Sequence, residues 1–345
     1  MPTLLVLVPF KDHHLRQIEQ ALGEGWQITT IPLADCSTPT AIGQCRSAAS
    51  EDELVEALCQ ASAVIGEPDP VLLRRAADAG AQLKLVQMTW SGTDKYTRST
   101  TAFPKGVALC NVAGAFGQII SQYVVGQTLS LMQNLPAYQR QQQRAEWNDL
   151  GPVASLDGAN VLIFGAGNIG TMVAKRLQGF SCTITGVCRN TDTPRSGFGQ
   201  LVTLEGAEKA LASADVVVGA IPNNSQTAGW LDERRLALMK ESSVIVNVGR
   251  GNFIDCDALA KHLASGRLRG AALDVSDPEP LPPSHPLWAE PRCTITPHVS
   301  GGSFGRHAQT ENNICAICCK NLAALAAGEP LFNQTPESAF AVPPA

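Results

Sequence analysis

Short apolar segments alternate with amphipathic segments along the first part of the chain. Five apolar segments have the length and the β-prone composition of buried strands, and they span residues 4–9, 27–32, 61–66, 83–88 and 106–112. Between them, residues 52–60 and 69–80 carry apolar positions at helical spacing. Because strands that alternate with helices form parallel sheets covered on both faces, this part of the chain predicts a small α/β domain.

A second series of apolar segments begins at residue 161. Six segments read as strands, and they span residues 161–164, 183–188, 215–222, 242–249, 270–275 and 293–298. With helices between them, they predict a doubly wound parallel sheet. In such a sheet ligands bind beyond the carboxyl ends of the strands, so the residues that follow each strand are expected to face one crevice.

Residues 115–135 separate the two series and are apolar almost all round, and the polar residues 137–151 follow. A helix that is apolar on more than one face must be buried, either between domains or against another subunit. We therefore expect a long buried helix here and a homodimer.

A glycine motif joins the strand at 161–164 to the next helical segment. Gly165, Gly167 and Gly170 have the spacing GxGxxG. In a dinucleotide site the first glycine allows the tight turn, the second lets a pyrophosphate approach the backbone, and the third lets helix and strand pack closely. A glycine cluster alone is more often a plain turn. The strand before it, the helix after it and the strand at 183–188 favour a dinucleotide site.

The residues that end the second of these strands bear on the choice of cofactor. NAD-binding domains usually have a carboxylate there for the adenosine ribose, whereas this chain has Cys188, followed by Arg189 and Asn190. A guanidinium can pair with the 2′-phosphate of NADP, which a carboxylate would repel. NADP(H) is therefore the favoured cofactor. The alternative is that Arg189 is only a solvated charge and that the protein accepts NAD(H) as well.

Polar residues follow the last three strands of the second series. Arg250 follows the fourth strand, Asp274 and Glu279 follow the fifth, and His298 follows the sixth. An arginine fork suits a carboxylate substrate, and a histidine suits a proton that must travel in each direction. Glu279 within hydrogen-bond reach would orient the imidazole. These residues predict a 2-oxo acid reductase, in which NADPH delivers a hydride to the keto carbon while His298 protonates the oxygen.

Four motifs in this order resemble one family, the D-isomer-specific 2-hydroxyacid dehydrogenases, which include the glyoxylate/hydroxypyruvate reductases. They are the glycine motif at 165–170 and the segments 247–251, 273–288 and 296–302. The resemblance implies that Arg250 binds the substrate carboxylate and that Glu279 assists His298 as the acid/base. It also implies that Asp274 contacts the nicotinamide carboxamide.

The resemblance implies further contacts as well. Backbone amides of the loop 90–94 would hold the substrate carboxylate, through Ser91 and Gly92. Eight further residues are expected at the cofactor: Asn168, Ile169, Ile221, Pro222, Thr227, Val248, Gly249 and Gly301.

The implied architecture is α/β with two Rossmann-like domains. Residues 1–104 would form a smaller, flavodoxin-like substrate domain, and residues 105–299 a dinucleotide-binding domain that includes the interdomain and dimerisation helix. In 300–345, a helix over about 305–327 would return to the substrate domain, and a disordered tail would follow over 337–345.

Composition narrows the partners. The 345 residues are 44% hydrophobic and 17% charged, with a net charge of −5. This balance excludes a basic surface for nucleic acid, and no apolar run is long enough to span a bilayer. We expect a cytoplasmic protein.

The eleven cysteines change this picture little. Most stand singly in apolar segments, as at Cys36, Cys59, Cys110 and Cys182, and behave as small apolar residues. Cys315, Cys318 and Cys319 share roughly one face of a helical segment, and no further ligands complete a zinc site, so we expect core packing and no metal.

Two alternatives remain. Instead of an NADPH-linked reductase, the protein could be an NAD-linked 2-hydroxyacid dehydrogenase acting mainly toward oxidation, or a dinucleotide-sensing binding protein of the kind that some relatives of the family represent. The substrate also stays open between glyoxylate or hydroxypyruvate and a bulkier 2-oxo acid.

Overall fold

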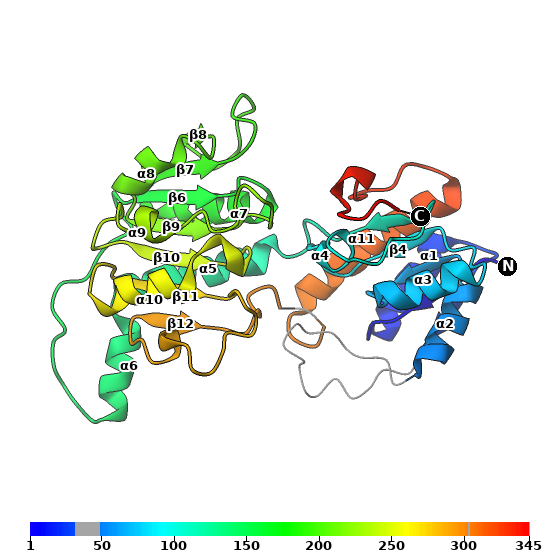
Figure 1. Cartoon of the computed structure of the whole chain (residues 1–345), viewed down its shortest axis with the longest axis horizontal. Helices are drawn as coiled ribbons and strands as arrows, with labels where there is room; N and C mark the ends of the chain where they lie inside the picture. Colours follow the sequence, from blue (N-terminus) through cyan, green and yellow to red (C-terminus); the bar gives the residue numbers. More distant parts are fainter. Residues whose placement is uncertain (32–48, 303, 345) are drawn as a thin grey trace. The chain divides into compact units, whose positions relative to one another are not determined.

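The computed structural model describes residues 1–31, 49–302 and 304–344, and its chain forms two compact units (Figure 1). The first unit contains residues 1–115 and 302–345, and the second contains residues 116–301. The chain was expected to leave the first domain after residue 104. It leaves after residue 115, because the strand at 108–110 belongs to the first sheet. Cys36 and residue 32, the end of a predicted strand, lie outside the described residues.

The first unit contains a five-stranded parallel sheet in the order β2-β1-β3-β4-β5. Its strands are β1 (Thr3–Val6), β2 (Gln27–Thr30), β3 (Ala63–Ile65), β4 (Leu85–Gln87) and β5 (Ala108–Cys110). Four of them lie within a predicted apolar segment, and β1 begins one residue before the predicted segment 4–9. This order is that of flavodoxin-like folds, so the predicted architecture of the smaller domain is confirmed.

Helices cover this sheet. They are α1 (Asp12–Leu22), α2 (Glu51–Gln60), α3 (Pro70–Asp78), the short α4 (Asp94–Thr97) and α11 (Ala308–Ala327). The ends of α2 and α3 follow local chemistry, since Ser50 and Glu53 form a capping box and Asp69 caps α3. The sequence interpretation missed α1, whose polar segment buries only His14, Ile18 and Leu22, one residue per turn.

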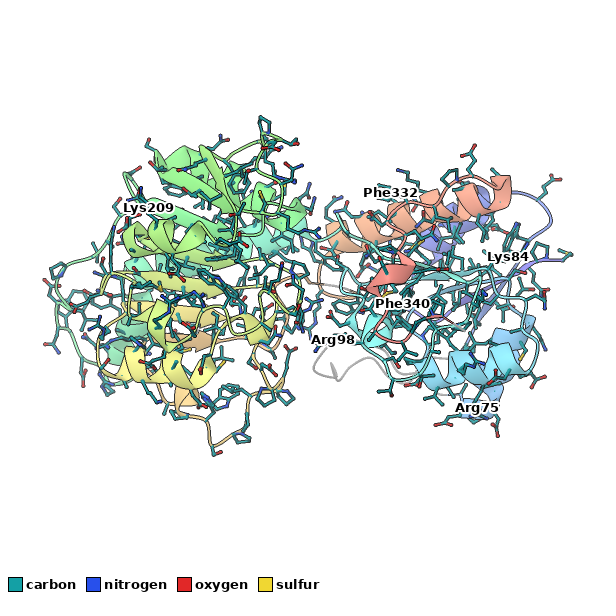
Figure 2. All side chains as sticks on the ribbon, turned by 45° about the horizontal axis from the view of Figure 1, so that its top comes forward. Arg75, Lys84, Arg98, Lys209, Phe332 and Phe340 are labelled. Atoms are coloured by element: carbon teal, nitrogen blue, oxygen red, sulfur yellow. The ribbon has the colours of Figure 1, made fainter. Side chains whose placement is uncertain are left out.

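The C-terminal segment packs within the first unit. Helix α11 lies against α1, where His14 Nε2 and Asn312 Oδ1 are 2.9 Å apart. Asn321 donates a 2.6 Å hydrogen bond to the buried Gln87 of β4. The tail differs from the predicted disorder, because the Phe340 ring (Figure 2) lies 5.2 Å from that of Phe103 after the short turn η4 (Glu337–Ala339).

The second unit contains a seven-stranded parallel sheet in the order β12-β11-β10-β9-β6-β7-β8. Its strands are β6 (Asn160–Phe164), β7 (Thr183–Val187), β8 (Gln200–Val202), β9 (Val216–Gly219), β10 (Val244–Asn247), β11 (Gly270–Leu273) and β12 (Cys293–Ile295). The predicted doubly wound sheet is confirmed. Its order reverses at β6, where β7 lies on one side and β9 on the other. The prediction missed β8, which has three residues, lies at the sheet edge and is partly exposed.

Helices flank both faces of this sheet. They are α5 (Gly117–Met132), α6 (Leu135–Gln143), α7 (Asn168–Leu177), α8 (Ala207–Ser213), α9 (Glu233–Leu236) and α10 (Cys256–Ala264), with short turns η1 (Gln178–Phe180), η2 (Gly251–Phe253) and η3 (Pro286–Trp288). The predicted long helix 115–135 is α5, which packs against α7, β10 and β11. It ends before Asn134, whose φ of +57° is outside the right-handed helical region.

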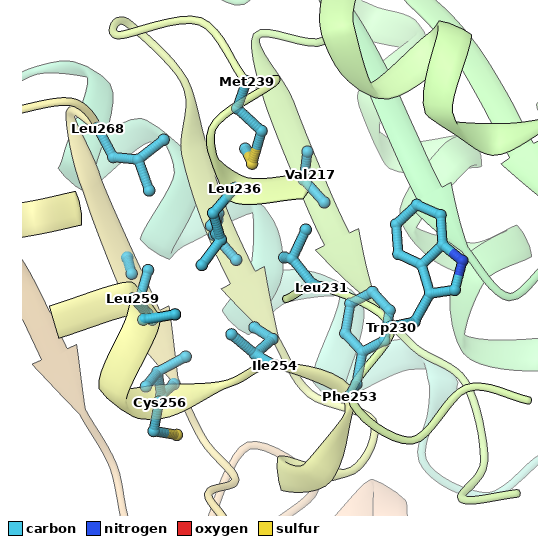
Figure 3. Packing of buried hydrophobic residues seen from close by; sticks show 14 of the residues in the cluster. Val217, Trp230, Leu231, Leu236, Met239, Phe253, Ile254, Cys256, Leu259 and Leu268 are labelled. Carbon is cyan, nitrogen blue, oxygen red and sulfur yellow. The ribbon is translucent and has the colours of Figure 1, made fainter. Parts of the chain in front are cut away.

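An apolar core fills the space beside the second sheet (Figure 3). Leu231, Ile254 and Leu259 are at most 3% exposed, and the rings of Trp230 and Phe253 stack with centroids 6.1 Å apart. This packing holds the loops after β9 and β10 against the sheet, and those loops carry predicted site residues.

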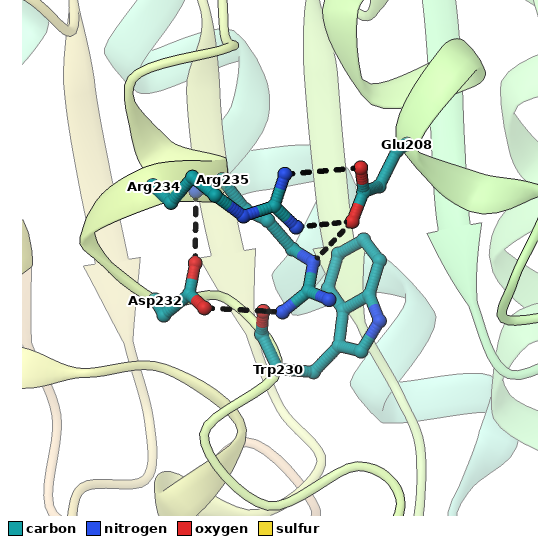
Figure 4. Close-up of polar contacts among 5 residues, drawn as sticks. All are labelled: Glu208, Trp230, Asp232, Arg234 and Arg235. Atoms are coloured by element: carbon teal, nitrogen blue, oxygen red, sulfur yellow. Dashed lines mark hydrogen bonds and ion pairs between the residues drawn. The ribbon is translucent and has the colours of Figure 1, made fainter.

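A surface ion-pair network lies beside Trp230 of this core (Figure 4). Glu208 of α8 accepts hydrogen bonds from Arg234 and Arg235, and these bonds lower the pKa of Glu208 to about 2. The Arg235 guanidinium lies 4.6 Å from the centroid of the Trp230 ring. The network joins α8 to α9 and involves no predicted site residue.

Within residues 1–31, 49–302 and 304–344, no helix is both long and apolar enough to cross a membrane. Over the same ranges, no group of three or more His, Cys, Asp and Glu side chains is arranged to hold a metal ion. Cys315 and Cys318 are buried in α11, where they pack as core residues.

Candidate active site

The glycine turn between β6 and α7 fits an anion by its geometry. Gly165 has a φ of +102°, and a Cβ on it would lie 2.4 Å from the Ala220 carbonyl oxygen. A Cβ on Gly170 would lie 1.8 Å from the Gly165 carbonyl oxygen. A Cβ on Gly167 would meet no atom within 4 Å, and no side chain caps the helix that starts there. The first amides of α7, at Asn168 and Ile169, therefore begin beside open space, which suits a pyrophosphate.

The turn after β7 carries the residues predicted for the adenosine end of the cofactor. Cys188 Sγ donates to the Asn190 carbonyl oxygen at 3.1 Å, and Asn190 Oδ1 accepts from the Asp192 amide at 2.9 Å. Arg189 is exposed beside them. The Nε atom of Arg195 on the same turn is buried without a hydrogen-bond partner among the described residues. A phosphate oxygen would satisfy such a donor.

The ends of β9 and β10 lie against each other. A Cβ on Gly249 would come within 2.7 Å of the Ile221 carbonyl oxygen, so only glycine allows this approach. Thr227 Oγ1 donates to the Pro222 carbonyl oxygen at 3.1 Å, which closes the loop after β9. Val248 is 6% exposed and therefore offers mainly its backbone to a ligand.

Arg250 is held in its turn by a residue that the sequence interpretation missed. Asn247 is 1% exposed, its Nδ2 donates to the Arg250 carbonyl oxygen at 3.0 Å, and its Oδ1 accepts from the Gly249 amide at 3.2 Å. The Arg250 Nη1 atom also donates to the Gly249 carbonyl oxygen at 2.9 Å. Asn247 is the first residue of the NVGRG segment, so its closeness to Arg250 in the sequence was the available signal.

His298 and Glu279 form the pair that the sequence interpretation anticipated. His298 Nδ1 and Glu279 Oε1 are 2.7 Å apart, and their side chains are 27% and 29% exposed. Because Nδ1 faces the carboxylate, Nε2 is the ring nitrogen left for a substrate.

Asp274 directly follows β11 and is 2% exposed. Its carboxylate accepts hydrogen bonds from the Val299 amide at 2.9 Å, the Ser300 amide at 3.0 Å and Thr296 Oγ1 at 2.6 Å. These bonds account for its burial without a cofactor. Gly301 also has a packing role, since a Cβ there would lie 3.0 Å from the Phe116 ring.

The loop proposed for the substrate carboxylate belongs to the first unit and follows β4. Ser91 and Gly92 are partly exposed, and Ser91 Oγ makes a 3.4 Å hydrogen bond to the Val112 carbonyl oxygen. Glu67, which follows β3, accepts from the Thr89 amide at 2.5 Å, and Lys95 donates to the Glu67 carbonyl oxygen at 2.5 Å. The sequence interpretation missed Glu67 and Lys95, because nothing in a sequence pattern joins residues 28 positions apart.

The comparisons with known proteins agree with this geometry. A family profile described as "D-isomer specific 2-hydroxyacid dehydrogenase, NAD binding domain" matches residues 125–300. A relative from Serratia proteamaculans, named glyoxylate/hydroxypyruvate reductase A, is 30% identical over 256 residues, which cover 72% of this chain and 78% of that protein. The chain therefore belongs to the D-isomer-specific 2-hydroxyacid dehydrogenase family, and the predicted resemblance is confirmed. It is an oxidoreductase of a family that uses NAD(P).

Solved structures agree. A D-isomer-specific 2-hydroxyacid dehydrogenase family protein from Aeromonas salmonicida is 31% identical with a TM-score of 0.80, and the alignment covers 97% of this chain and 99% of that one. A family member from Xanthobacter autotrophicus, solved in complex with NADPH and MES, is 23% identical with a TM-score of 0.75, covering 97% and 98%. At that identity the second match supports the fold alone.

Glu67→Gln should gain stability relative to the wild type as the pH rises. Burial raises the pKa of Glu67, and the hydrogen bonds from Thr89 oppose this shift only in part. The folded chain therefore holds this proton more tightly than the unfolded chain, and the associated stabilisation is lost as the pH rises through the folded-state pKa. Thermal unfolding midpoints of both proteins, measured from about pH 4 to about pH 8, check this.

Glu56→Gln removes the same charge at an exposed position of α2 and supplies the baseline for that comparison. A wild-type-to-variant difference at Glu67 that stays flat across the pH range would contradict the prediction.

Proposed function

We propose that the protein reduces a 2-oxo acid to the D-2-hydroxy acid with NADPH, and that the reaction is reversible. The observation that carries the proposal is the 2.7 Å pair of His298 Nδ1 and Glu279 Oε1. It leaves Nε2 to give a proton to the keto oxygen in reduction and to take one from the hydroxyl group in oxidation. A bound nicotinamide supplies the hydride that the keto carbon receives. Glu279 holds the ring, and Arg250 binds the substrate carboxylate.

The remaining contacts follow the same proposal. The backbone amides of Ser91 and Gly92 bind the substrate carboxylate. The turn of Gly165, Gly167 and Gly170 holds the pyrophosphate, supported by the open space at Gly167. Asp274, Ile221, Pro222, Thr227, Val248, Gly249 and Gly301 surround the nicotinamide half of the cofactor.

NADP(H) is preferred over NAD(H) in this proposal. Cys188 stands where a carboxylate would exclude a 2′-phosphate, Arg189 is exposed next to it, and Arg195 has an unsatisfied buried Nε nearby.

The substrate class in this proposal is glyoxylate or hydroxypyruvate. The Serratia relative carries that name. Gln87 is 0% exposed and bonded to Asn321, so it belongs to the core and not to a pocket wall.

Initial rates with glyoxylate, hydroxypyruvate, 2-oxoisocaproate and phenylpyruvate test the reaction. The wild type should oxidise NADPH with a small 2-oxo acid. His298→Asn should lower kcat/KM by about 10²-fold to 10⁴-fold, because the proton donor is lost, and it should leave the Kd for NADPH unchanged.

A matched control comes from a second histidine-carboxylate pair. His285 Nε2 lies 3.3 Å from Asp257 Oδ1 and belongs to no proposed site, so His285→Asn should retain activity. Tight dinucleotide binding without turnover of any substrate would contradict the reductase and favour a dinucleotide-sensing protein.

Arg189→Asp should reduce the preference for NADPH. Losing a charge-assisted bond to the 2′-phosphate and gaining a repulsive carboxylate should lower the ratio of kcat/KM for NADPH to that for NADH by about tenfold or more. Lys209→Asp, at an exposed position of α8 (Figure 2), makes the same change of charge away from the site and should leave the ratio unchanged. An unchanged ratio in Arg189→Asp would instead favour the reading of Arg189 as a solvated charge.

A homodimer is part of the proposal. Trp147 is 100% exposed in the single chain, and Leu135 and Val153 in the same region are 53% and 52% exposed. Large apolar side chains exposed together usually mark an interface. The wild type should therefore elute as a dimer in size-exclusion chromatography with light scattering, and Trp147→Lys should shift it toward monomer. Leu238→Lys, at a separate exposed leucine, should not. A monomeric wild type would contradict the dimer.

A further inference from the structure

A hydrogen-bonded chain of side chains runs from Tyr123 of helix α5 through Thr296 to the Asp274 carboxylate. Tyr123 Oη lies 2.7 Å from Thr296 Oγ1, and Thr296 Oγ1 lies 2.6 Å from Asp274 Oδ1. The three residues come from three elements of the second unit: Tyr123 from α5, Asp274 from the end of β11 and Thr296 from the end of β12. None of the sequence motifs links Tyr123 to the other two.

The protons of this chain have one consistent arrangement. Thr296 has a single hydroxyl proton, which it donates to the Asp274 carboxylate, so Tyr123 must be the donor to Thr296. Burial raises the pKa of Tyr123 to about 12, which keeps its hydroxyl group protonated at working pH. The chain therefore runs in one direction, from Tyr123 through Thr296 to Asp274.

Asp274 in turn holds the backbone on both sides of His298. Its Oδ1 accepts from the Val299 amide, its Oδ2 accepts from the Ser300 amide, and its carbonyl oxygen accepts from the His298 amide at 2.9 Å. His298 has a φ of +52°, in the left-handed region that residues other than glycine rarely adopt. A backbone in that region persists only where surrounding contacts hold it.

We propose that Thr296 is a positioning residue for His298, that it acts by fixing the Asp274 carboxylate, and that Tyr123 acts through Thr296. The inference rests on the proposed function, in which His298 exchanges the substrate proton. Two restraints then orient His298. Glu279 sets the direction of the ring through Nδ1, and the hydroxyl chain sets the backbone that carries the ring.

The consequence for the reaction is specific. Without the Thr296 hydroxyl, Asp274 Oδ1 loses one of its two donors, and the carboxylate is free to turn away from the Val299 and Ser300 amides. A proton donor displaced by a fraction of an ångström delivers its proton less often. In the described part of the chain, the glycine turn and the residues after β7, which hold the other half of the dinucleotide in the proposed function, make no contact with the Thr296 hydroxyl group. The chain should therefore affect kcat more than cofactor binding.

Thr296→Val tests this, because valine keeps the shape of threonine and removes only the hydroxyl group. It should lower kcat for the 2-oxo acid by about tenfold or more, with the KM and the Kd for NADPH within about twofold of the wild type. Thr296→Ser restores the hydroxyl group and should recover most of kcat.

Tyr123→Phe removes the outer donor alone and should lower kcat less than Thr296→Val does. Because Tyr123 acts through Thr296, the double variant Tyr123→Phe/Thr296→Val should have the kcat of Thr296→Val alone. If Thr296→Val does not fold, Tyr123→Phe and Thr296→Ser still test the chain.

Thr128→Val is the matched control. Thr128 is buried on the same helix as Tyr123, and its hydroxyl group donates to the Val124 carbonyl oxygen at 2.8 Å. This variant should lose thermal stability and keep the wild-type kcat, which separates a positioning effect from a general loss of a buried hydrogen bond.

Three results overturn the proposal. A Thr296→Val protein with the wild-type kcat, or a double variant whose losses multiply, shows that the chain does not position His298 while the reductase itself stands. A wild type that binds NADPH but reduces no 2-oxo acid overturns the proposed function, and the positioning role falls with it.

Discussion

The second unit depends on how closely the backbone of β6 approaches helix α7. A Cβ on Gly170 would lie 1.8 Å from the Gly165 carbonyl oxygen, so no other residue allows the two elements this separation. The approach sets the start of α7 directly beyond the carboxyl end of the central strand, where the sheet order reverses. The helix begins there without a side-chain cap, and a Cβ on Gly167 would meet no atom within 4 Å.

Two buried polar side chains of the second unit hold the backbone of loops that carry proposed site residues. Asn247 brackets the turn of Arg250, and Asp274 brackets the loop of His298. Both side chains are at most 2% exposed and are satisfied by protein groups. Buried polar groups with all partners in place rigidify the loops that carry them. The more exposed site residues, Arg250 and His298, are therefore supported by buried ones.

In the first unit, buried polar groups also support a loop that carries proposed site residues. The loop after β4 is held by Glu67, whose carboxylate accepts from Thr89, and by Lys95, which donates back to the Glu67 backbone. Burial raises the pKa of Glu67 and lowers the pKa of Lys95, because the loss of water disfavours the charged form of each side chain. Such groups are usual beside functional loops, where position is maintained at some cost in stability.

The sequence by itself determined the described strands other than β8, the glycine turn and the pair of His298 with Glu279. Those features depend on apolar periodicity and on the rule that residues after parallel strands share one edge. It missed β8, whose three residues at a sheet edge carry no periodicity, and α1, which buries only one residue per turn. It also predicted a disordered tail, whereas Phe340 of the tail packs on Phe103. Only the tertiary structure decided that Tyr123, Thr296 and Asp274 form one chain, because hydrogen bonds between residues 173 and 22 positions apart depend on how α5, β11 and β12 pack together.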